Sequence, residues 1–315
     1  MKICILDWST VSSGDISSDI FNELGEIQCF ETCSNESAAE LIGNADMVLC
    51  NKVLITDDVI AKCPNLKYIG LFATGYNNID LESAEKHKIT VCNAGSYSSY
   101  AVAQHTFAYI LDYSSKISEY DQFVKNDGWI NSKTFSKFPF RTVELFNKTL
   151  AVIGFGNIGK TVSRIAEAFG MNVIINTRTK PESCQYELVS VKEAFERADF
   201  LTVHCPLNEQ TAEIINAQTL SYMKDSAVII NTSRGGIVDE KALADALNSK
   251  KISAAYLDVL ASEPMSPDTP LKNAANCIIT PHMAWAPLET RSRLVDIVSA
   301  NIRAYLNGKT QNRIV

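Results

Sequence analysis

Three ionisable side chains in the second half of the chain, Arg234, Glu263 and His282, each follow a short apolar run. Such runs are typical of buried parallel strands, and open α/β sheets bind ligands where their strands end. A guanidinium binds a carboxylate through two N–H groups, and an imidazole holds and releases a proton near neutral pH. A carboxylate beside the imidazole would stabilise its charged form. Together these groups fit hydride transfer to a carbonyl, which needs a cation, a proton donor and a group that tunes the donor.

The other histidines leave the choice of proton donor open. His204 ends a predicted strand and could line a ligand pocket, so spacing alone does not separate it from His282. His105 falls on the apolar face of a predicted helix, where we expect a hydrogen-bonded core residue. His87 lies in a charged turn and is expected to be solvated. Isolated Arg and Glu residues after strands are also common as surface or capping residues, so residue type alone does not fix their roles.

A glycine-rich turn in the middle of the chain predicts a dinucleotide site. It follows the apolar run 150–153, opens a predicted helix and precedes another strand at 172–176, which is the spacing of a βαβ unit. Its glycines would allow a tight turn, close approach of the backbone to a pyrophosphate, and close packing of helix on strand. The helix N-terminus would offer free N–H groups to the phosphates. The residues of the turn are Gly154, Phe155, Gly156, Asn157, Ile158 and Gly159.

The strand after this turn ends without the acidic residue that NAD sites normally place on the ribose 2′-OH. The sequence there is Thr177, Arg178, Thr179 and Lys180, and the first acid is Glu182. Cationic and hydroxyl groups could bind a 2′-phosphate, which a carboxylate would repel. We therefore expect NADP(H), or the use of both NADP(H) and NAD(H); the alternative is a solvated basic turn without a ligand.

Composition excludes several other functions. The 315 residues carry 29 Lys+Arg and 36 Asp+Glu, a net charge of −7, so we expect no nucleic-acid or anionic-membrane partner. The nine cysteines are scattered without zinc-type spacing, which argues against a metal site and a disulfide framework and favours a cytoplasmic protein. No apolar run approaches the length of a membrane span, and the first is too short for a signal peptide.

Short apolar runs alternate with helix-period stretches in two series, which predicts two α/β units with mainly parallel sheets covered on both faces. Between the series we expect a connecting helix over residues 98–123 and an aromatic surface arm over residues 125–147. Strands are expected at residues 2–6, 27–30, 47–51, 68–72, 89–92, 150–154, 172–176, 200–204, 227–231, 253–257 and 277–280. Further helices are expected at residues 15–24, 37–42, 57–61, 81–87, 158–169, 191–197, 240–247 and 288–306, with Thr56 and Asp80 as N-caps.

Five motifs beyond the glycine turn make the sequence resemble the D-isomer-specific 2-hydroxyacid dehydrogenase family over nearly the whole chain. The motifs are Ala73–Asp80, Ser99–Thr106, Asn231–Gly236, Asp258–Pro264 and Pro281–Ala284. The resemblance implies two doubly wound parallel-sheet domains. A Rossmann dinucleotide domain, residues 99–283, would be inserted into a flavodoxin-like substrate domain, residues 1–98 plus 284–315. This insertion accounts for a glycine turn that begins at residue 154, and the hinges would lie near residues 99 and 283.

The resemblance also implies roles for single residues. Arg234 would bind and polarise the substrate, His282 would be the acid/base, and Glu263 would be its partner. The substrate would lie against Thr74, Gly75 and Tyr97, with its carboxylate on the backbone amides of the first two. The cofactor would lie along His204, Cys205, Pro206, Thr232, Ser233 and Asp258.

Within the family, residues 71–77 and 280–287 are most similar to the glycerate dehydrogenases, also called hydroxypyruvate reductases. The expected activity is reduction of a small 2-keto acid, such as hydroxypyruvate or glyoxylate, to the D-2-hydroxy acid by a homodimer. A bulkier 2-keto acid is one alternative. A formate dehydrogenase would carry Gln in place of Glu263. A dinucleotide-sensing corepressor of the same fold would carry terminal extensions that we do not expect here.

Overall fold

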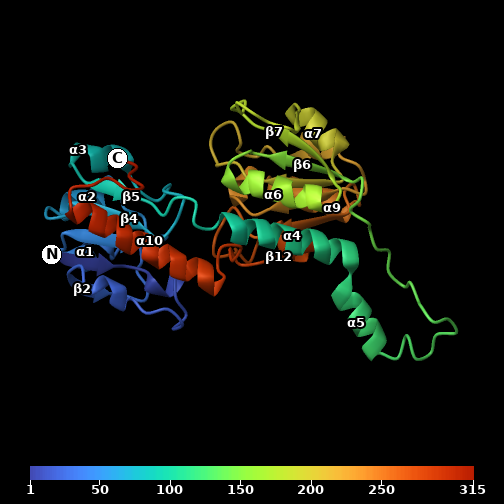
Figure 1. Ribbon diagram of the computed structural model, residues 1–315, viewed down its shortest axis with the longest axis horizontal. Helices are drawn as coiled ribbons and strands as arrows, with labels where there is room; N and C mark the ends of the chain where they lie inside the picture. The colour runs from blue at the N-terminus through green and yellow to red at the C-terminus, as the bar shows by residue number, and fades with distance from the viewer. The chain divides into compact units, whose positions relative to one another are not determined.

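Runs of buried apolar residues form twelve strands in two separate sheets, and the computed structural model describes all residues from Met1 to Val315. One unit contains residues 1–98 and 286–315, and the other contains residues 99–285 (Figure 1). The chain therefore leaves the first unit once and returns to it once, so the second unit is an insertion within the first.

The five-stranded sheet of the first unit has the order β2-β1-β3-β4-β5, and every neighbouring pair is parallel. This is the flavodoxin-like order. Helices α1, α2 and α3 pack on one face, where Ile60 and Ala84 are buried, and α10 packs on the other through Leu294 and Val298. The strands are β1 (Lys2–Ile5), β2 (Glu26–Cys29), β3 (Met47–Cys50), β4 (Tyr68–Leu71) and β5 (Thr90–Cys92). The helices are α1 (Ala38–Ile42), α2 (Asp57–Lys62), α3 (Leu81–Lys86) and α10 (Leu288–Leu306).

The helix expected over residues 15–24 is wrong, because only Asp19–Phe21 form a single 3₁₀ turn. The Arg291 guanidinium donates to both carboxylate oxygens of Asp15, at 2.8 and 2.6 Å, and fixes the preceding loop. Phe21 packs edge to face on Trp8 with ring centroids 6.4 Å apart. These tertiary contacts outweigh the local helical periodicity.

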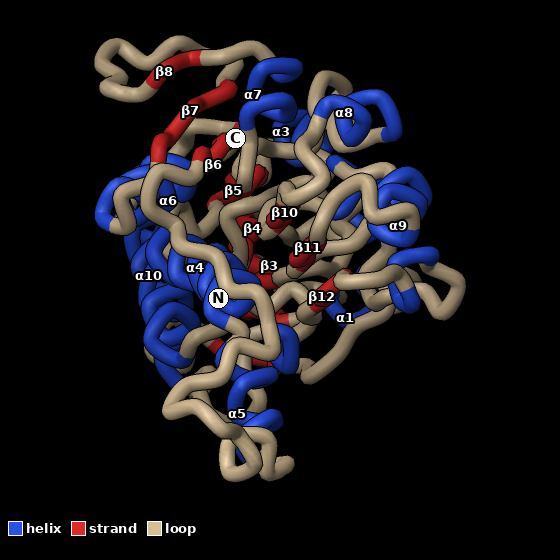
Figure 2. Tube along the Cα trace, turned by 90° about the vertical axis from the view of Figure 1, so that its right-hand side faces the viewer, coloured by secondary structure: helices blue, strands red, loops and turns tan.

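The seven-stranded sheet of the second unit is parallel throughout and has the order β12-β11-β10-β9-β6-β7-β8. The strand order reverses beside β6, which makes the carboxyl end of β6 the switch point where such sheets bind ligands. Helices α7, α8 and α9 cover one face, and α4 and α6 cover the other (Figure 2). The strands are β6 (Thr149–Ile153), β7 (Asn172–Asn176), β8 (Glu187–Leu188), β9 (Phe200–Val203), β10 (Val228–Asn231), β11 (Ala254–Leu257) and β12 (Cys277–Ile279). The helices are α4 (Ser99–Ser115), α6 (Asn157–Ala168), α7 (Val191–Arg197), α8 (Ala217–Tyr222) and α9 (Glu240–Asn248).

The connecting helix expected over residues 98–123 is interrupted. Lys116 adopts the left-handed conformation, with φ = 55°, and separates α4 from α5 (Ile117–Lys125). The chain turns there, and α5 and the arm, residues 125–147, extend away from the sheet of the second unit (Figure 1). A non-glycine residue in this region ends the regular hydrogen bonding of one helix and sets the direction of the next.

The predicted α/β class and its two parallel sheets are confirmed. Thr56 and Asp80 are N-caps, and their side chains accept from the backbone N–H groups of Val59 and Ser83. The sequence patterns missed α8 and the two-residue strand β8, both too short for a clear period. None of the helices combines the length and apolar character that crossing a bilayer requires.

Candidate active site

The three ionisable residues lie on loops that leave adjacent strands at the same level. Asn231 of β10 pairs with Leu257 of β11, and Leu257 pairs with Ile279 of β12. Backbone hydrogen bonds continue beyond the strands, because the N–H of Asp258 donates to Asn231 O at 2.9 Å and the N–H of His282 donates to Asp258 O at 2.8 Å. Parallel pairing therefore brings the loops with Arg234, Glu263 and His282 to one edge of one sheet.

His282 and Glu263 form a direct contact. His282 Nδ1 lies 2.6 Å from Glu263 Oε2, and the other carboxylate oxygen accepts from the backbone N–H of Leu260 at 3.0 Å. Both side chains are partly exposed, at 24% and 35%. The contact occupies Nδ1, so Nε2 is the ring nitrogen that a ligand can reach. This pair can hold a proton and release it at Nε2 while the carboxylate stabilises the charged ring.

The turn that carries Arg234 is shaped by the buried amide of Asn231. The Asn231 side chain donates to the carbonyl of Arg234 at 2.9 Å and accepts from the backbone N–H of Ser233 at 3.0 Å. The guanidinium donates to Ser233 O at 2.7 Å, and no carboxylate lies within ion-pair distance of it. Arg234 is thus a half-buried cation that has no acidic partner, as expected for a group that binds an anionic ligand.

Gly235 holds the Arg234 turn against the loop that leads to Glu263. A Cβ atom at Gly235 would lie 1.8 Å from the carbonyl carbon of Leu260 and 2.3 Å from the nitrogen of Ala261. The backbones of the two loops therefore touch. Glu240, at the start of α9, fixes the second loop by accepting from the N–H of Ala261 at 2.8 Å.

A cavity of about 600 Å³ lies at the carboxyl end of β6, beside the glycine turn. Gly154 adopts φ = 97°, and a Cβ atom there would lie 2.6 Å from Cys205 N. A Cβ atom at Gly159 would lie 2.2 Å from Gly154 O, whereas one at Gly156 would meet nothing within 4 Å. The first and last glycines are therefore required for backbone packing, and the middle one keeps open the space before α6. A pyrophosphate fits this space and would meet the N–H groups at the start of α6.

Most of the predicted cofactor residues line this cavity. Those that do are Gly154, Phe155, Gly156, Thr177, Arg178, Thr179, His204, Cys205 and Pro206. Those that do not are Asn157, Ile158, Gly159, Thr232, Ser233 and Asp258. The sequence reading missed Asn208, Gln210 and Thr211, which also line the cavity. Their position just after β9, at the ligand-binding edge of the sheet, is the signal that could have identified them.

The basic turn after β7 borders the same cavity. Arg178 is exposed and forms no ion pair, and the turn contains no acidic side chain before Glu182. The ribose end of a dinucleotide bound across β6 would lie near this turn. The turn can therefore accept a group with negative charge and has no carboxylate to repel it.

The histidines differ in their surroundings. His204 is half-buried, its Nε2 lies 2.9 Å from Thr202 Oγ1, and desolvation of the ring lowers the pKa of His204 to about 3. The ring is therefore neutral near pH 7 and does not supply an imidazolium proton. His105 is half-buried, with Nε2 3.3 Å from Thr280 Oγ1, and His87 is exposed, as expected for both. Among the histidines, only His282 lies against a carboxylate within hydrogen-bond distance.

The residues expected at the substrate lie in the other unit, after its β4 and β5. Asn93 donates to Thr74 O at 2.7 Å, and the Thr74 hydroxyl donates to Gly95 O. The backbone N–H groups of Thr74 and Gly75 have no protein acceptor, so they remain available to an anion. Tyr97 is buried, and its carbonyl accepts from Arg293 at 2.9 Å.

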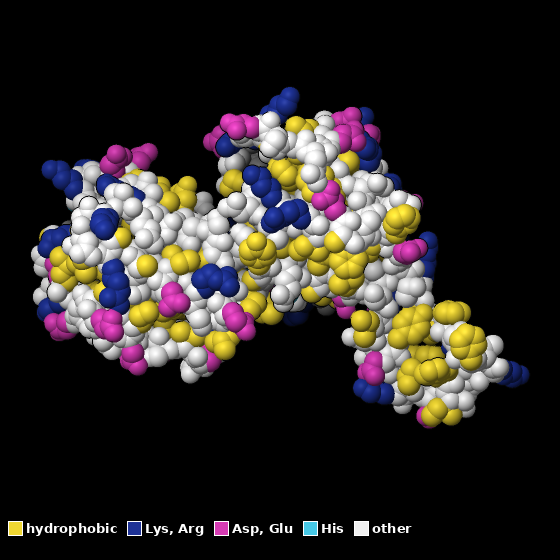
Figure 3. Space-filling model, in the orientation of Figure 1, with side chains coloured by type: hydrophobic (Ala, Val, Ile, Leu, Met, Phe, Trp, Pro, Cys, Tyr) yellow, Lys and Arg dark blue, Asp and Glu magenta, His cyan; other side chains and the backbone are white.

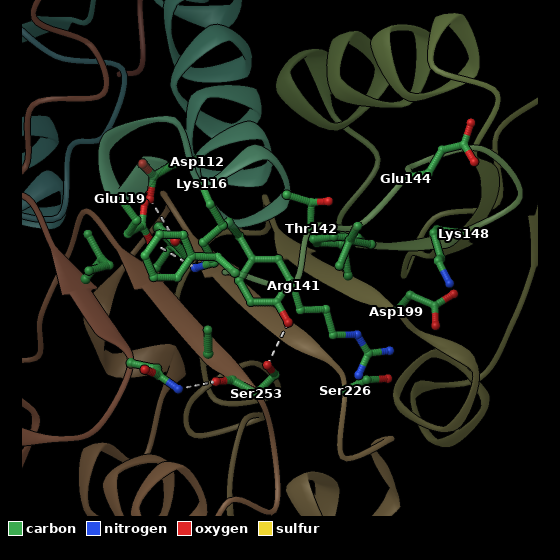
Figure 4. Close-up of a pocket in the computed structure, with 18 of the residues that line it drawn as sticks. Asp112, Lys116, Glu119, Arg141, Thr142, Glu144, Lys148, Asp199, Ser226 and Ser253 are labelled. Atoms are coloured by element: carbon green, nitrogen blue, oxygen red, sulfur yellow. Dashed lines mark hydrogen bonds and ion pairs between the residues drawn. The ribbon is translucent and has the colours of Figure 1, made fainter. Parts of the chain in front are cut away.

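A larger cavity, of about 1060 Å³, lies at the opposite edge of the second sheet (Figure 4). It is lined by residues at the amino ends of strands, such as Lys148, Asp199 and Ser253, and by the arm, including Arg141. Both acidic and basic side chains line it. It contains none of the three candidate residues, so its size does not make it the reaction site.

Comparisons with known proteins agree with this architecture. The family described as D-isomer specific 2-hydroxyacid dehydrogenase, NAD binding domain, matches residues 107–284. The hydroxypyruvate reductase of Blautia hydrogenotrophica is 37% identical over 99% of both chains. The glycerate dehydrogenase of Methylorubrum extorquens is 34% identical over 99% of this chain and 98% of its own. An acyclic imino acid reductase solved in complex with NADPH and D-arginine is 32% identical, with a TM-score of 0.89 and full coverage of both chains.

The fold, the glycine turn and these matches define a nicotinamide-dependent oxidoreductase. The chain belongs to the D-isomer-specific 2-hydroxyacid dehydrogenase family, as the sequence motifs predicted. Its second unit contains the region that matches the NAD-binding domain of that family.

We expect Gly235→Ala to lower both stability and activity, because the added methyl group would clash with the backbone of Leu260. Neither of the two loop backbones can move aside without disturbing its own hydrogen bonds. Overpacking of this kind costs about 1–3 kcal/mol. Thermal unfolding and kcat with the nicotinamide cofactor would measure the two effects. Gly236→Ala is the matched control, since its nearest neighbour is the flexible end of Leu207 at 3.0 Å. Equal behaviour of the two variants would contradict the proposed loop contact.

Proposed function

We propose that the protein reduces a small 2-keto acid to the D-2-hydroxy acid with a nicotinamide cofactor, and that hydroxypyruvate and glyoxylate are its substrates. The observation that carries the proposal is the 2.6 Å contact between His282 Nδ1 and Glu263 Oε2. The backbone N–H of His282 donates to Asp258, and the N–H of Asp258 donates to Asn231, the residue that shapes the turn of Arg234. Arg234 itself has no acidic partner. The names of the hydroxypyruvate reductase and glycerate dehydrogenase relatives support this substrate class.

A bound dihydronicotinamide ring would supply the hydride that adds to C2 of the keto acid. The guanidinium of Arg234 binds the substrate carboxylate and stabilises the negative charge that develops on the C2 oxygen. The imidazolium of His282 donates its Nε2 proton to that oxygen, which completes the hydroxyl group and leaves a neutral ring. Glu263 holds Nδ1 and stabilises the ring while it is charged. Solvent then returns a proton to His282.

Recognition of the substrate carboxylate would also involve the first unit. The free N–H groups of Thr74 and Gly75 provide two donors in one turn, which suits an anionic oxygen. Tyr97 follows the neighbouring strand and is held in place through Arg293. A small substrate with a polar C3 group fits a site that contains such donors better than a bulky apolar one.

We further propose that NADPH is the preferred cofactor. Arg178 supplies a cation without an internal partner at the border of the dinucleotide cavity, and hydroxyl groups of Thr177 and Thr179 flank it. The first acid of the segment, Glu182, is outside the lining of the cavity. A similar structure, the acyclic imino acid reductase, was solved with NADPH.

The arm supports the proposal that the protein is a homodimer. Phe135 and Phe138 are 92% and 80% exposed, and with Trp129 and Ile130 they form an apolar surface on the arm (Figure 3). Exposed apolar patches of this kind mark interaction sites. A second copy is the partner we propose, because the arm carries the exposed cations Lys133 and Lys137 beside its apolar surface, and the cavity that the arm helps to line contains acidic as well as basic side chains that could pair with an arm of another copy (Figure 4). Exchange of arms between two copies would satisfy both features with one symmetric contact.

The reaction is tested by oxidation of NADPH and NADH with hydroxypyruvate, glyoxylate and bulkier 2-keto acids, followed by enantiomer analysis of the product. His282→Ala should lower kcat by about 10²–10⁴, the usual effect of removing a general acid. The dissociation constant of NADPH should not change, because the ring does not line the dinucleotide cavity. His87→Ala, which alters an exposed histidine, is the control.

Two results would contradict this reaction. Absence of turnover with every keto acid, despite binding of the dinucleotide, would favour the sensing corepressor. An unchanged kcat in His282→Ala, with turnover in the parent enzyme, would remove His282 from the proton step only.

Arg178→Ala should raise the KM for NADPH by about tenfold or more and leave the KM for NADH within about twofold, because only NADPH carries the 2′-phosphate. Initial rates at saturating keto acid measure both constants. Arg197→Ala is the control, since Arg197 is paired with Glu187 and does not line the cavity. A preference of the parent enzyme for NADH of tenfold or more would exclude this cofactor assignment.

Sedimentation velocity at micromolar concentration should give the mass of a dimer, and the double variant Phe135→Asp, Phe138→Asp should sediment as a monomer. The charged groups would be desolvated in an apolar interface, which makes association unfavourable. Leu54→Asp, which places the same charge on an exposed apolar residue of the first unit, should stay dimeric. A monomeric parent protein, or a dimeric double variant, would rule out the arm as the interface.

A further inference from the structure

The turn that contains Thr74 and Gly75 is fixed by the segment that follows β5. The N–H of Ala94 donates to Ala73 O at 2.9 Å, and the side-chain amide of Asn93 donates to Thr74 O at 2.7 Å. A trans peptide points its N–H away from its carbonyl. The two carbonyls belong to the same peptide units as the free N–H groups of Thr74 and Gly75. The two bonds therefore set the directions in which both free N–H groups point.

Asn93 can hold the turn because all four of its polar groups are bound. Its side-chain amide binds Thr74 O, and its side-chain oxygen accepts from the N–H of Gly95 at 3.0 Å. Its backbone N–H donates to Asn312 O at 3.1 Å, and its backbone carbonyl accepts from the side-chain amide of Asn301 at 2.8 Å. Asn93 is buried, so water competes little for these bonds. The position of Asn93 is therefore set by α10 and by the segment that follows it.

Asn312 orients the side chain of Asn301. Residues 312–315 run antiparallel to β5, the edge strand of the first sheet. From this position the Asn312 side-chain amide donates to Asn301 Oδ1 at 3.0 Å. An amide side chain has one acceptor end and one donor end, so acceptance at Oδ1 turns the NH₂ group of Asn301 toward Asn93. Asn301 is 2% exposed and belongs to α10, which leaves its side chain little freedom to reorient.

We propose that Asn301 and Asn312 are positioning residues for recognition of the substrate carboxylate. They hold Asn93, and Asn93 in turn aims the N–H groups of Thr74 and Gly75. This inference rests on the proposed function, because it takes the carboxylate of a 2-keto acid as the anion that these N–H groups bind. Both asparagines act through Asn93 and not by contact with the acid.

The test is Asn312→Asp, a change of similar shape at an exposed residue. A carboxylate cannot donate to Asn301 Oδ1 and instead attracts the NH₂ group of Asn301. The Asn301 side chain would then turn its oxygen toward the carbonyl of Asn93, and the bond between them would be lost. We expect the KM for hydroxypyruvate to rise by about five- to twentyfold with kcat within about twofold, because the weakened contact binds substrate and transition state alike.

Binding of oxamate, an analogue of a small 2-keto acid, gives a readout that does not depend on turnover. Calorimetry on the NADPH complex should show a dissociation constant about five- to twentyfold higher in Asn312→Asp than in the parent. The dissociation constant of NADPH should stay within about twofold, because only residues of the second unit line the dinucleotide cavity.

Asn307→Asp is the matched control. It makes the same change at another exposed asparagine, just after α10, whose side-chain amide donates to Arg303 O and takes no part in this network. Its KM for hydroxypyruvate and its dissociation constant for oxamate should equal those of the parent. An equal rise in both variants would overturn the inference, because added negative charge alone would then explain the result.

Asn301→Ala removes the donor to Asn93 and the acceptor for Asn312 together, so it should weaken substrate and oxamate binding at least as much as Asn312→Asp. If Asn301→Ala does not fold, the exposed Asn312 variant decides the question. A merely structural role would lower the melting temperature of the variants and leave KM and oxamate binding of the folded protein unchanged. That result, or a fall in kcat without a change in KM, would overturn the positioning role.

The outcomes also separate this inference from the proposed function. If the parent turns over no keto acid but binds oxamate, and Asn312→Asp weakens that binding, the reaction fails and the positioning role stands. If the parent is active, but Asn312→Asp keeps both its KM and its oxamate dissociation constant, the positioning role fails alone. A parent protein that neither turns over a keto acid nor binds oxamate would overturn both.

Discussion

The arrangement of the site depends on parallel hydrogen bonding between β10, β11 and β12. Because Asn231, Leu257 and Ile279 pair at one level, the three loops that follow begin at the same edge of the sheet. Residues far apart in sequence are thereby brought close enough for His282 and Glu263 to form a hydrogen bond. The close approach of Gly235 to Leu260 then fixes two of these loops to each other at the level of the backbone. The positions of the candidate side chains at this edge are therefore set by backbone hydrogen bonds and backbone contacts.

Periodicity and motif spacing predicted the larger part of this architecture. Buried parallel strands appear in the sequence as continuous apolar runs, so both sheets could be located. The bounds of the expected strands differ from those in the structure by at most one residue at either end. The patterns failed where a tertiary contact decides the conformation. Asp15 forms an ion pair with Arg291, which lies near the other end of the chain, and the local sequence around Asp15 does not predict that pairing. Lys116 adopts a left-handed conformation, which cannot be predicted from a lysine at that position.

The candidate site shows the same division. Arg234, Glu263 and His282 could be singled out because each follows a strand, but their residue types did not separate His282 from His204. Their surroundings separate them, since desolvation lowers the pKa of His204 to about 3 and no carboxylate contacts its ring, whereas His282 contacts Glu263. Asp258 illustrates a further limit: the resemblance assigned it to the cofactor, whereas its bonds to Met283 and Ala284 become visible only when the loop is seen in three dimensions.

The division of the chain into two units has a consequence for how such a protein can change. All groups assigned to proton handling lie within residues 99–285, and the free amides of Thr74 and Gly75 lie within residues 1–98. If the amides of Thr74 and Gly75 bind the substrate as proposed, residues that contact the acid and residues that transfer the proton are encoded in separate segments of the gene. Substitutions in the first unit could then change the fit of the acid without altering Glu263 or His282.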